Sequence, residues 1–212
     1  MFLNFFIKNK NYLILLFTVV YVMAFAVNAY VNHNIEFIYY TILLIGLIYI
    51  IVLIHQHLRL GFFIIVNLSL LGFFHLLGGN YYIGTTRLYE CYLIPGVIRY
   101  DNFVHSYGTL IATVALYTLI ADFVDERVRK HFIIFAFGLV LMAIGLGTIN
   151  ELVEFFAVIF LNAAEQVGGY YNNTLDLLFN TVGSIFGCVV VYLYIERPRI
   201  LKKINDKINK NN

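Results

Sequence analysis

Six long apolar stretches constrain this chain more than any other feature of its sequence. A helix needs about 20 residues to cross a hydrocarbon core of about 30 Å, and each stretch is near that length. The stretches are continuously apolar, without the alternation of membrane β-strands, so each is expected to cross as an α-helix. The expected spans cover approximately residues 12–31, 35–54, 60–77, 103–123, 132–155 and 175–195.

The composition agrees with an integral membrane protein. Only 12% of the residues are charged and 61% are hydrophobic, at a mean hydropathy of +0.83, whereas roughly a quarter of a soluble domain is charged. A net charge of +2, with the basic residues at helix ends, excludes a nucleic-acid-binding surface. Cys91 and Cys188 are too far apart to indicate a disulfide framework or a zinc site. We therefore predict one all-α domain over residues 1–212, a polytopic membrane helical bundle in contact with the lipid bilayer.

The first stretch has some features of a secretory signal peptide. Lys8 and Lys10 precede it, and small residues lie near Ala26 and Ala29. It is longer than a usual signal core and has no convincing cleavage site, so we expect it to be retained as the first span.

The lysines and arginines predict the orientation. With the N-terminus inside, twelve of the 14 are cytoplasmic and two, Arg87 and Arg99, are outside. Six remain inside when the tail at 197–212 is left out, so we expect an N-in/C-in chain. The tail is rich in Lys and Asn and predicts a short, solvated cytoplasmic segment attracted to anionic lipid. The twelve are Lys8, Lys10, Arg59, Arg127, Arg129, Lys130, Arg197, Arg199, Lys202, Lys203, Lys207 and Lys210.

The longest connection, residues 78–102, is rich in tyrosine and contains Pro95 and Gly96, which interrupt a helix. Its apolar part, residues 88–98, is too short to span. Because tyrosine is enriched at headgroup depth, we expect this segment to be interfacial or re-entrant and to act as a lid.

Six ionisable residues fall at one set of helix ends, on the side opposite the basic residues. Asp101 and His105 are i and i+4, and Glu151 and Glu154 are i and i+3, so each pair shares a helix face. From Phe132 the rise to Glu151 is about 28 Å at 1.5 Å per residue, which is near the outer boundary. The residues expected at one depth are His75, Asp101, His105, Glu151, Glu154 and Asp176, with Asn180 one turn deeper and able to hydrogen-bond across the bundle.

Such a cluster needs compensation. A charged side chain at bilayer depth costs roughly 2.5–3.5 kcal/mol even on insertion scales, and Arg99 is the basic residue nearby in the sequence. Glu151 and Glu154 repel each other if both ionise, unless a cation lies between them. A divalent metal ion and shared protons are the two arrangements that satisfy this set.

Most of these residues also have an ordinary structural explanation. His75 is typical of an interfacial histidine, and Asp101 and Asp176 are placed to cap the helices that follow them. Glu151 and Glu154 fit such an explanation least well, because the C-terminal end of a helix disfavours anions.

Four motifs, in this order, resemble the YjdF type of uncharacterised inner-membrane proteins. They are His75-Leu-Leu-Gly78-Gly79 followed by Tyr81-Tyr82, Tyr100-Asp101-x-x-x-His105, Glu151-x-x-Glu154, and Asp176-x-x-x-Asn180-x-x-Gly183-x-x-x-Gly187. The last three are similar, more distantly, to VanZ-like membrane proteins, some of which are linked to glycopeptide resistance. The resemblance covers roughly half of the chain. It implies a multi-pass protein of a bacterial inner (cytoplasmic) membrane and implies no particular reaction.

Two function classes follow from the cluster. In the first, the chain is a membrane-embedded, metal-dependent hydrolase or transferase that acts on a phosphate or ester of an envelope lipid. Its residues are then His75, Asp101, His105 and Asp176 as metal ligands, Glu151 or Glu154 as general base, Asn180 in support, and Arg99 with Tyr100 as substrate contacts. In the second, the same residues bind protons or a cation in a small transporter or membrane sensor. A structural membrane protein with a compensated polar cluster is a third interpretation.

Overall fold

The chain forms a bundle of long helices in a computed structural model that describes residues 2–58, 60–163 and 169–211. Arg59, which enters the charge count, and Asn212, the end of the predicted tail, lie outside the described residues. Six helices are long and apolar enough to span a membrane, so the predicted all-α polytopic architecture is confirmed. They are α1 (Phe2–Val31), α2 (Ile35–Leu58), α3 (Phe62–Asn80), α4 (Tyr100–Ile120), α6 (Phe132–Leu161) and α8 (Tyr170–Val191).

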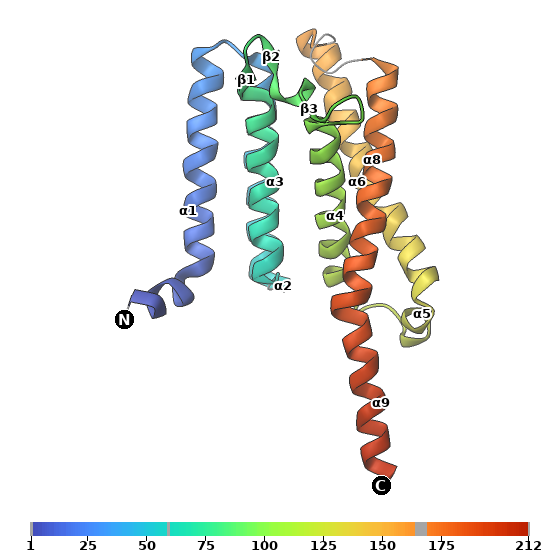
Figure 1. Ribbon diagram of the computed structural model, residues 1–212. Coiled ribbons are helices and arrows are strands. Elements are labelled where there is room, and N and C mark those ends of the chain that lie inside the picture. The colour runs from blue at the N-terminus through green and yellow to red at the C-terminus, as the bar shows by residue number, and fades with distance from the viewer. Residues whose placement is uncertain (1, 59, 164–168, 212) are drawn as a thin grey trace.

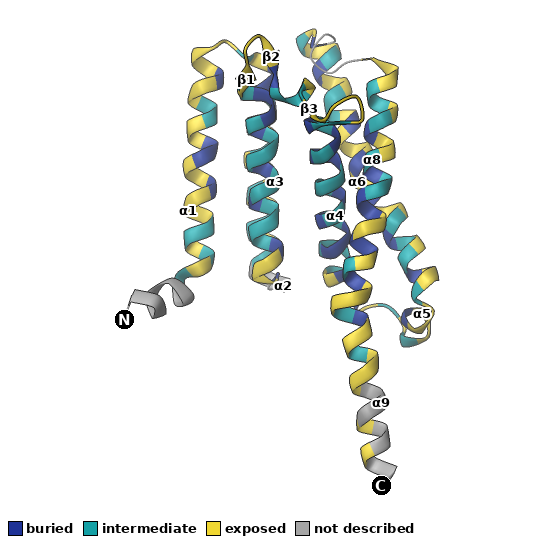
Figure 2. Cartoon of the chain, viewed as in Figure 1, coloured by how far each residue is buried: buried dark blue, intermediate teal, exposed yellow. Residues whose placement is uncertain are grey.

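Helix α4 lies at the centre of the bundle. It packs against α3, α6 and α8, whereas α1 packs against α2 and α3 (Figure 1). In Figure 2 the ribbon of α4 is mostly buried or intermediate, whereas α1 carries many exposed residues. Both chain ends lie toward the end of the bundle opposite the β-strands (Figure 1), as an even number of spans requires.

All six spanning helices extend past the predicted spans at one end, and three of these extensions bear on the site. Helix α4 begins at Tyr100 and not at residue 103, α8 begins at Tyr170 and not at 175, and α6 continues to Leu161 and not only to 155. Backbone hydrogen bonding continues the helices past the apolar positions that define a span.

The capping explanation for the two aspartates is wrong. The N-cap of α4 is Arg99, whose backbone N–H donates to Oδ1 of Asn102 at 3.0 Å. The N-cap of α8 is Gly169. Asp101 and Asp176 therefore lie inside their helices, where their carboxylates are free for other contacts.

The connection between α3 and α4, which is expected to be an interfacial or re-entrant lid, forms short antiparallel strands. Strand β1 (Tyr82–Ile83) pairs with β2 (Thr86–Arg87), and β3 (Tyr92–Ile94) pairs with β4 (Ile98–Arg99), with the 3₁₀ turn η1 (Leu88–Glu90) between them. The segment lies across one end of the bundle (Figure 1). It is anchored to α2 by a buried ion pair, Arg87 Nη1 to Glu36 Oε2 at 3.2 Å.

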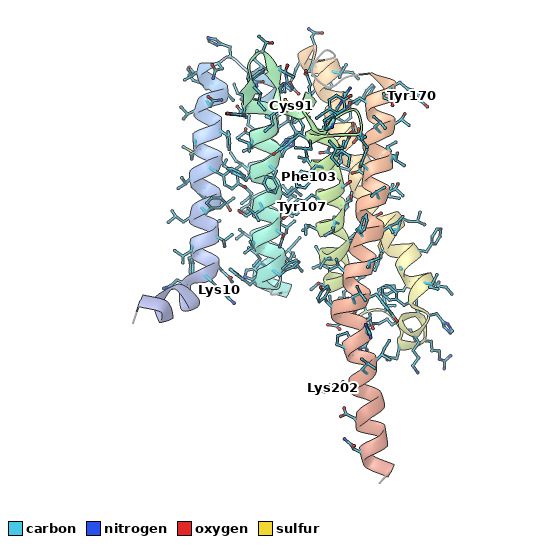
Figure 3. The ribbon with its side chains drawn as sticks, in the orientation of Figure 1. Lys10, Cys91, Phe103, Tyr107, Tyr170 and Lys202 are labelled. Atoms are coloured by element: carbon cyan, nitrogen blue, oxygen red, sulfur yellow. The ribbon has the colours of Figure 1, made fainter. Side chains whose placement is uncertain are left out.

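The opposite end of the bundle carries the basic residues. Helix α5 (Glu126–Lys130) precedes α6, and α8 continues through a π-helical turn, η2 (Tyr192–Glu196), into α9 (Arg197–Asn211). The predicted tail is therefore helical, and α9 projects beyond the bundle (Figure 1). Side chains of Lys10 and Lys202 lie toward this end, and those of Cys91 and Tyr170 toward the other (Figure 3).

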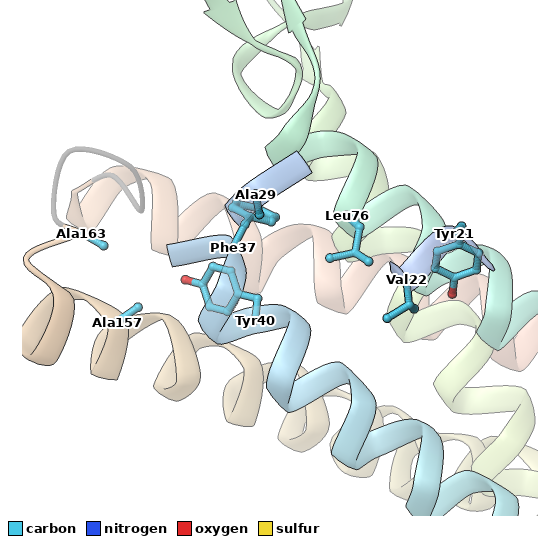
Figure 4. Packing of buried hydrophobic residues seen from close by; sticks show 8 residues of the cluster. All are labelled: Tyr21, Val22, Ala29, Phe37, Tyr40, Leu76, Ala157 and Ala163. Atoms are coloured by element: carbon cyan, nitrogen blue, oxygen red, sulfur yellow. The ribbon is translucent and has the colours of Figure 1, made fainter. Parts of the chain in front are cut away.

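Buried apolar side chains form two clusters. The first joins α1, α2 and α3 to the last turns of α6, and its members are Tyr21, Val22, Ala29, Phe37, Tyr40, Leu76, Ala157 and Ala163 (Figure 4). The second joins α3, α4, α6 and α8, and its members are Ile64, Val114, Tyr117, Ala121, Phe135, Leu139, Cys188 and Val191. Helices α3 and α6 contribute to both clusters, so they hold the two parts of the bundle together.

Candidate functional site

Two glycines bring α4 and α8 into backbone contact. A Cβ atom at Gly183 would lie 2.0 Å from the carbonyl oxygen of Ser106, and one at Gly187 would lie 2.8 Å from that of Leu110. Small residues permit such an approach between membrane helices. The contact places the face of α4 that carries His105 directly beside the polar face of α8.

His105 lies at the centre of the site, with a carboxylate on each side of its ring. Nε2 lies 3.4 Å from Oδ1 of Asp101 and 3.7 Å from Oδ1 of Asp176. Nδ1 lies 3.6 Å from Oε1 of Glu151 and 3.3 Å from Oδ1 of Asn180. One imidazole from α4 thus links acidic residues of α4, α6 and α8.

Asn172 connects the two aspartates to Arg99. Its Nδ2 donates to Oδ2 of Asp176 at 2.9 Å and lies 3.4 Å from Oδ2 of Asp101. Its Oδ1 accepts from Nη1 of Arg99 at 3.5 Å. The guanidinium group of Arg99 also lies over the ring of Tyr92, 5.4 Å from its centroid, so this cation stands between the strands and the acidic cluster.

The carboxylates are buried and incompletely hydrogen-bonded. Asp176 is fully buried and Glu151 is 8% exposed. Three of their oxygens have no hydrogen-bond partner among the described residues. These are both carboxylate oxygens of Glu151 and Oδ1 of Asp176. A buried acceptor without a partner costs about 1–3 kcal/mol, and more if it is charged, so these oxygens indicate a site built for a further positive group.

Two sets of these residues have the donor atoms of a metal site. Asp101, His105 and Asp176 form one set, and His105, Glu151 and Glu154 form the other, with the donor atoms of each set within 4.8 Å of one another. Donors of one ion at bond lengths of about 2.1 Å lie at most roughly 4 Å apart. Either set therefore needs only small side-chain movements to close on an ion.

His75 is placed apart from both sets, in an aromatic environment. Its ring lies 5.6 Å from that of Phe37 and 5.5 Å from that of Tyr40, and its Nδ1 is 2.6 Å from the hydroxyl of Tyr89. Burial raises the pKa of Tyr89 well above its usual value, so this hydroxyl stays protonated and available to donate. Tyr100, expected to contact a substrate, donates its hydroxyl to the backbone carbonyl of Phe74 at 3.0 Å.

Two further polar residues contact predicted site residues although the sequence pattern does not single them out: Asn172 contacts Asp101 and Asp176, and Tyr89 contacts His75. Asn172 lies four residues before Asp176, so the i, i+4 rule that pairs Asp101 with His105 also predicts a shared face here. The predicted span begins at residue 175, so Asn172 lies outside the helix that the sequence predicts. Tyr89 has no signal of this kind, because a contact between a loop tyrosine and a helix histidine depends on the path of the loop.

The comparison with protein families gives one match. A family model described as "Predicted membrane protein (DUF2238)" matches residues 12–197. No curated protein matches the chain, and no solved structure matches it.

Proposed function

The chain belongs to the DUF2238 family of predicted membrane proteins, which is the YjdF type that its motifs resemble, and from its buried cluster we propose that it binds a divalent metal ion between α4 and α8. The observation that carries the proposal is the set of buried carboxylate oxygens without partners around His105. A divalent ion offsets the charge of such a set, whereas without a cation or a shared proton these oxygens stay unsatisfied.

We assign the ion to the Nε2 side of His105, with Asp101 and Asp176 as the other ligands. A metal-bound histidine usually donates its second ring N–H to a carbonyl or carboxylate oxygen. On the Nδ1 side, Asn180 Oδ1 is placed to accept that proton at 3.3 Å, and Glu151 Oε1 lies just outside hydrogen-bond distance at 3.6 Å. A mixed set of one imidazole and two carboxylates suits Mn²⁺ or Zn²⁺.

The reaction that this site favours is hydrolysis or transfer at a phosphate or ester group. When bound, the ion supplies Lewis-acid polarisation of the substrate oxygen. Glu154 takes the role of general base. Its carboxylate lies within 4.8 Å of donor atoms of His105 and Glu151. Among the contacts described, its one hydrogen bond is from Asn150 Nδ2 to Oε1, at 2.8 Å. Arg99 provides a cation for an anionic group of the substrate.

Cation transport ranks second. A transport route would have to continue from His105 toward the basic end of the bundle. Along α4 and α8 that direction is occupied by the close contacts of Gly183 and Gly187, and the hydroxyls of Thr109 and Thr113 are bonded to carbonyls of their own helix at 3.0 Å and 2.7 Å. The site therefore favours chemistry at one end of the bundle.

Metal content tests the proposal directly. We expect about one ion per chain in purified wild-type protein, and affinity lowered at least tenfold in Asp101→Asn and Asp176→Asn, because loss of a ligand exceeds the 10–100-fold cost of an outer-shell change. Elemental analysis after dialysis against Mn²⁺ or Zn²⁺ measures this. Glu90→Gln, which removes an exposed acid from the loop at the same end, should bind like wild type. Equal metal content in all four proteins would remove the metal site.

The stability of Asp176→Asn should depend on the metal. Without metal, the variant is expected to be at least as stable as wild type, because a buried charge with an unpaired oxygen has been neutralised. With metal at about 100 times its dissociation constant, wild type should gain about 2.7 kcal/mol and the variant much less. Thermal unfolding in one detergent, with and without chelator, gives both values. Equal metal-induced gains in the two proteins would contradict the assignment of Asp176 as a ligand.

A further inference from the structure

Helix α6 carries a polar pair, Asn150 and Glu154, among exposed apolar residues of the same helix. Asn150 is exposed, and its Nδ2 donates to Oε1 of Glu154 at 2.8 Å. Exposed apolar residues lie on both sides along the helix, with Leu146 at 45% before the pair and Phe155 and Phe160 at 51% and 75% after it. The pair thus lies within the apolar length of a spanning helix, and an uncovered polar pair in such a helix is costly and is typical of functional positions.

The polar pair leads directly to the candidate metal site. Glu154 shares the pair with Asn150, and it also lies within 4.8 Å of donor atoms of His105 and Glu151. It is half-buried, whereas Glu151 is buried. Glu154 is therefore the member of the acidic cluster on α6 that keeps some exposure, as Asp101 does on α4.

Helices α2 and α6 are in contact near the polar pair. The hydroxyl of Tyr39 donates to the carbonyl oxygen of Val153 at 3.5 Å, and Tyr40 and Ala157 belong to the same buried cluster (Figure 4). About two turns further along α2, a side chain at Gly46 would meet no described atom within 4 Å. Apolar side chains of both helices beyond this contact are exposed. These are Leu43 at 41% and Ile50 at 51% on α2, and Met142 at 39% and Leu146 at 45% on α6.

The geometry points to a phospholipid with an amine-bearing headgroup as the substrate, which reaches the site sideways between α2 and α6. This inference rests on the proposed function. Acyl chains match the apolar walls, and the carboxylates of Glu154 and Glu151 match an ammonium group at the headgroup end. The phosphate of the same headgroup then lies toward the metal ligands and Arg99. A helix of a second copy would cover Asn150 but would leave the acidic end of the opening without a cationic partner.

A tryptophan reporter tests this route, because the chain contains no tryptophan. Leu146→Trp places one beside the opening, and Ile133→Trp places one at an 86% exposed position near the other end of α6. Both proteins are reconstituted in phosphatidylcholine vesicles with a minor fraction of brominated phosphatidylethanolamine or brominated phosphatidylglycerol. At position 146 we expect brominated phosphatidylethanolamine to quench tryptophan fluorescence about threefold more effectively than brominated phosphatidylglycerol. This factor corresponds to the free energy of one partly exposed ion pair. The control position, which lies beside the basic residues of α5, should show no preference for the ethanolamine lipid, and Glu154→Gln should remove the preference at 146.

The outcomes separate the route from the metal site. Equal quenching by the two lipids at position 146 would overturn the inference, as would protection from both lipids in a dimeric sample, which would assign the face to a second copy. If the preference is present but elemental analysis finds no metal, the lateral route stands and the proposed function fails. If metal binds and no preference is found, the route fails and the metal site stands.

Discussion

Replacing Glu196 with alanine should lower the free energy of unfolding by about 3–5 kcal/mol, the usual cost of leaving a buried charge without its partner. Glu196 and Arg129 are 1% and 8% exposed. Oε1 of Glu196 accepts from Nη2 of Arg129 at 2.6 Å and from its Nε at 3.1 Å, and it also accepts from the hydroxyl of Tyr117. Nη1 of Arg129 donates to the carbonyl of Ala121 at 3.1 Å. The carboxylate therefore joins the end of α4, helix α5 and the π-helical turn before α9.

The matched control is Glu126→Ala at the same end of the bundle. Glu126 pairs with Arg199 at 2.6 Å, but their side chains are 43% and 30% exposed, and exposed pairs contribute about 0–1 kcal/mol. Thermal or denaturant unfolding of both variants in one detergent measures the difference. Similar losses for the two variants would show that burial of the Arg129–Glu196 pair does not set its contribution.

Replacing Gly183 with alanine should cost about 1–3 kcal/mol or more, the usual range for overpacking a buried position. The added Cβ would lie 2.0 Å from the carbonyl oxygen of Ser106 and 2.4 Å from Oγ1 of Thr109. Because the closer atom belongs to the backbone, rotation of a side chain cannot relieve the clash, and α4 and α8 must separate. Separation moves His105 away from Asp176, so metal affinity should fall with stability.

Gly145→Ala is the control on α6. A Cβ atom at Gly145 meets no described atom within 4 Å, and alanine in a helix interior is favoured over glycine by roughly 0.5–1 kcal/mol. The two Gly→Ala changes are therefore expected to shift the unfolding temperature in opposite directions. A loss at position 145 equal to that at 183 would contradict the close contact between α4 and α8 as the cause.

The six spans were predictable because hydropathy over about 20 residues reports whether a helix fits the hydrocarbon core. The helix ends were less predictable. Residues 170–174 read as a polar connection, yet they form the first turn of α8, since a helix needs no apolar side chains to satisfy its own backbone. This difference affects the site. A helix that starts at residue 175 does not include Asn172, so the i, i+4 spacing that pairs Asn172 with Asp176 is not predicted.

The site was predictable in depth and less so in detail. Helix lengths placed His75 and His105 at the same level of the membrane, and both lie toward the end of the bundle that carries the strands. Only His105 has carboxylates around its ring, whereas His75 faces Phe37, Tyr40 and Tyr89. Spacing along a helix shows which residues share a face, but it does not show which neighbour that face meets.

Position along the membrane normal therefore follows from the order of residues, because each residue advances a helix by about 1.5 Å. Rotation about each helix axis does not, because it depends on contacts between residues far apart in the chain. Gly183 against Ser106 orients α8 on α4, and Gly147 against Asn180, where a Cβ would lie 2.6 Å from Nδ2, orients α6 on α8. These close approaches turn Asp101, Glu151 and Asp176 toward one imidazole, and they leave Asn150 and Glu154 at the side of the bundle that faces α2.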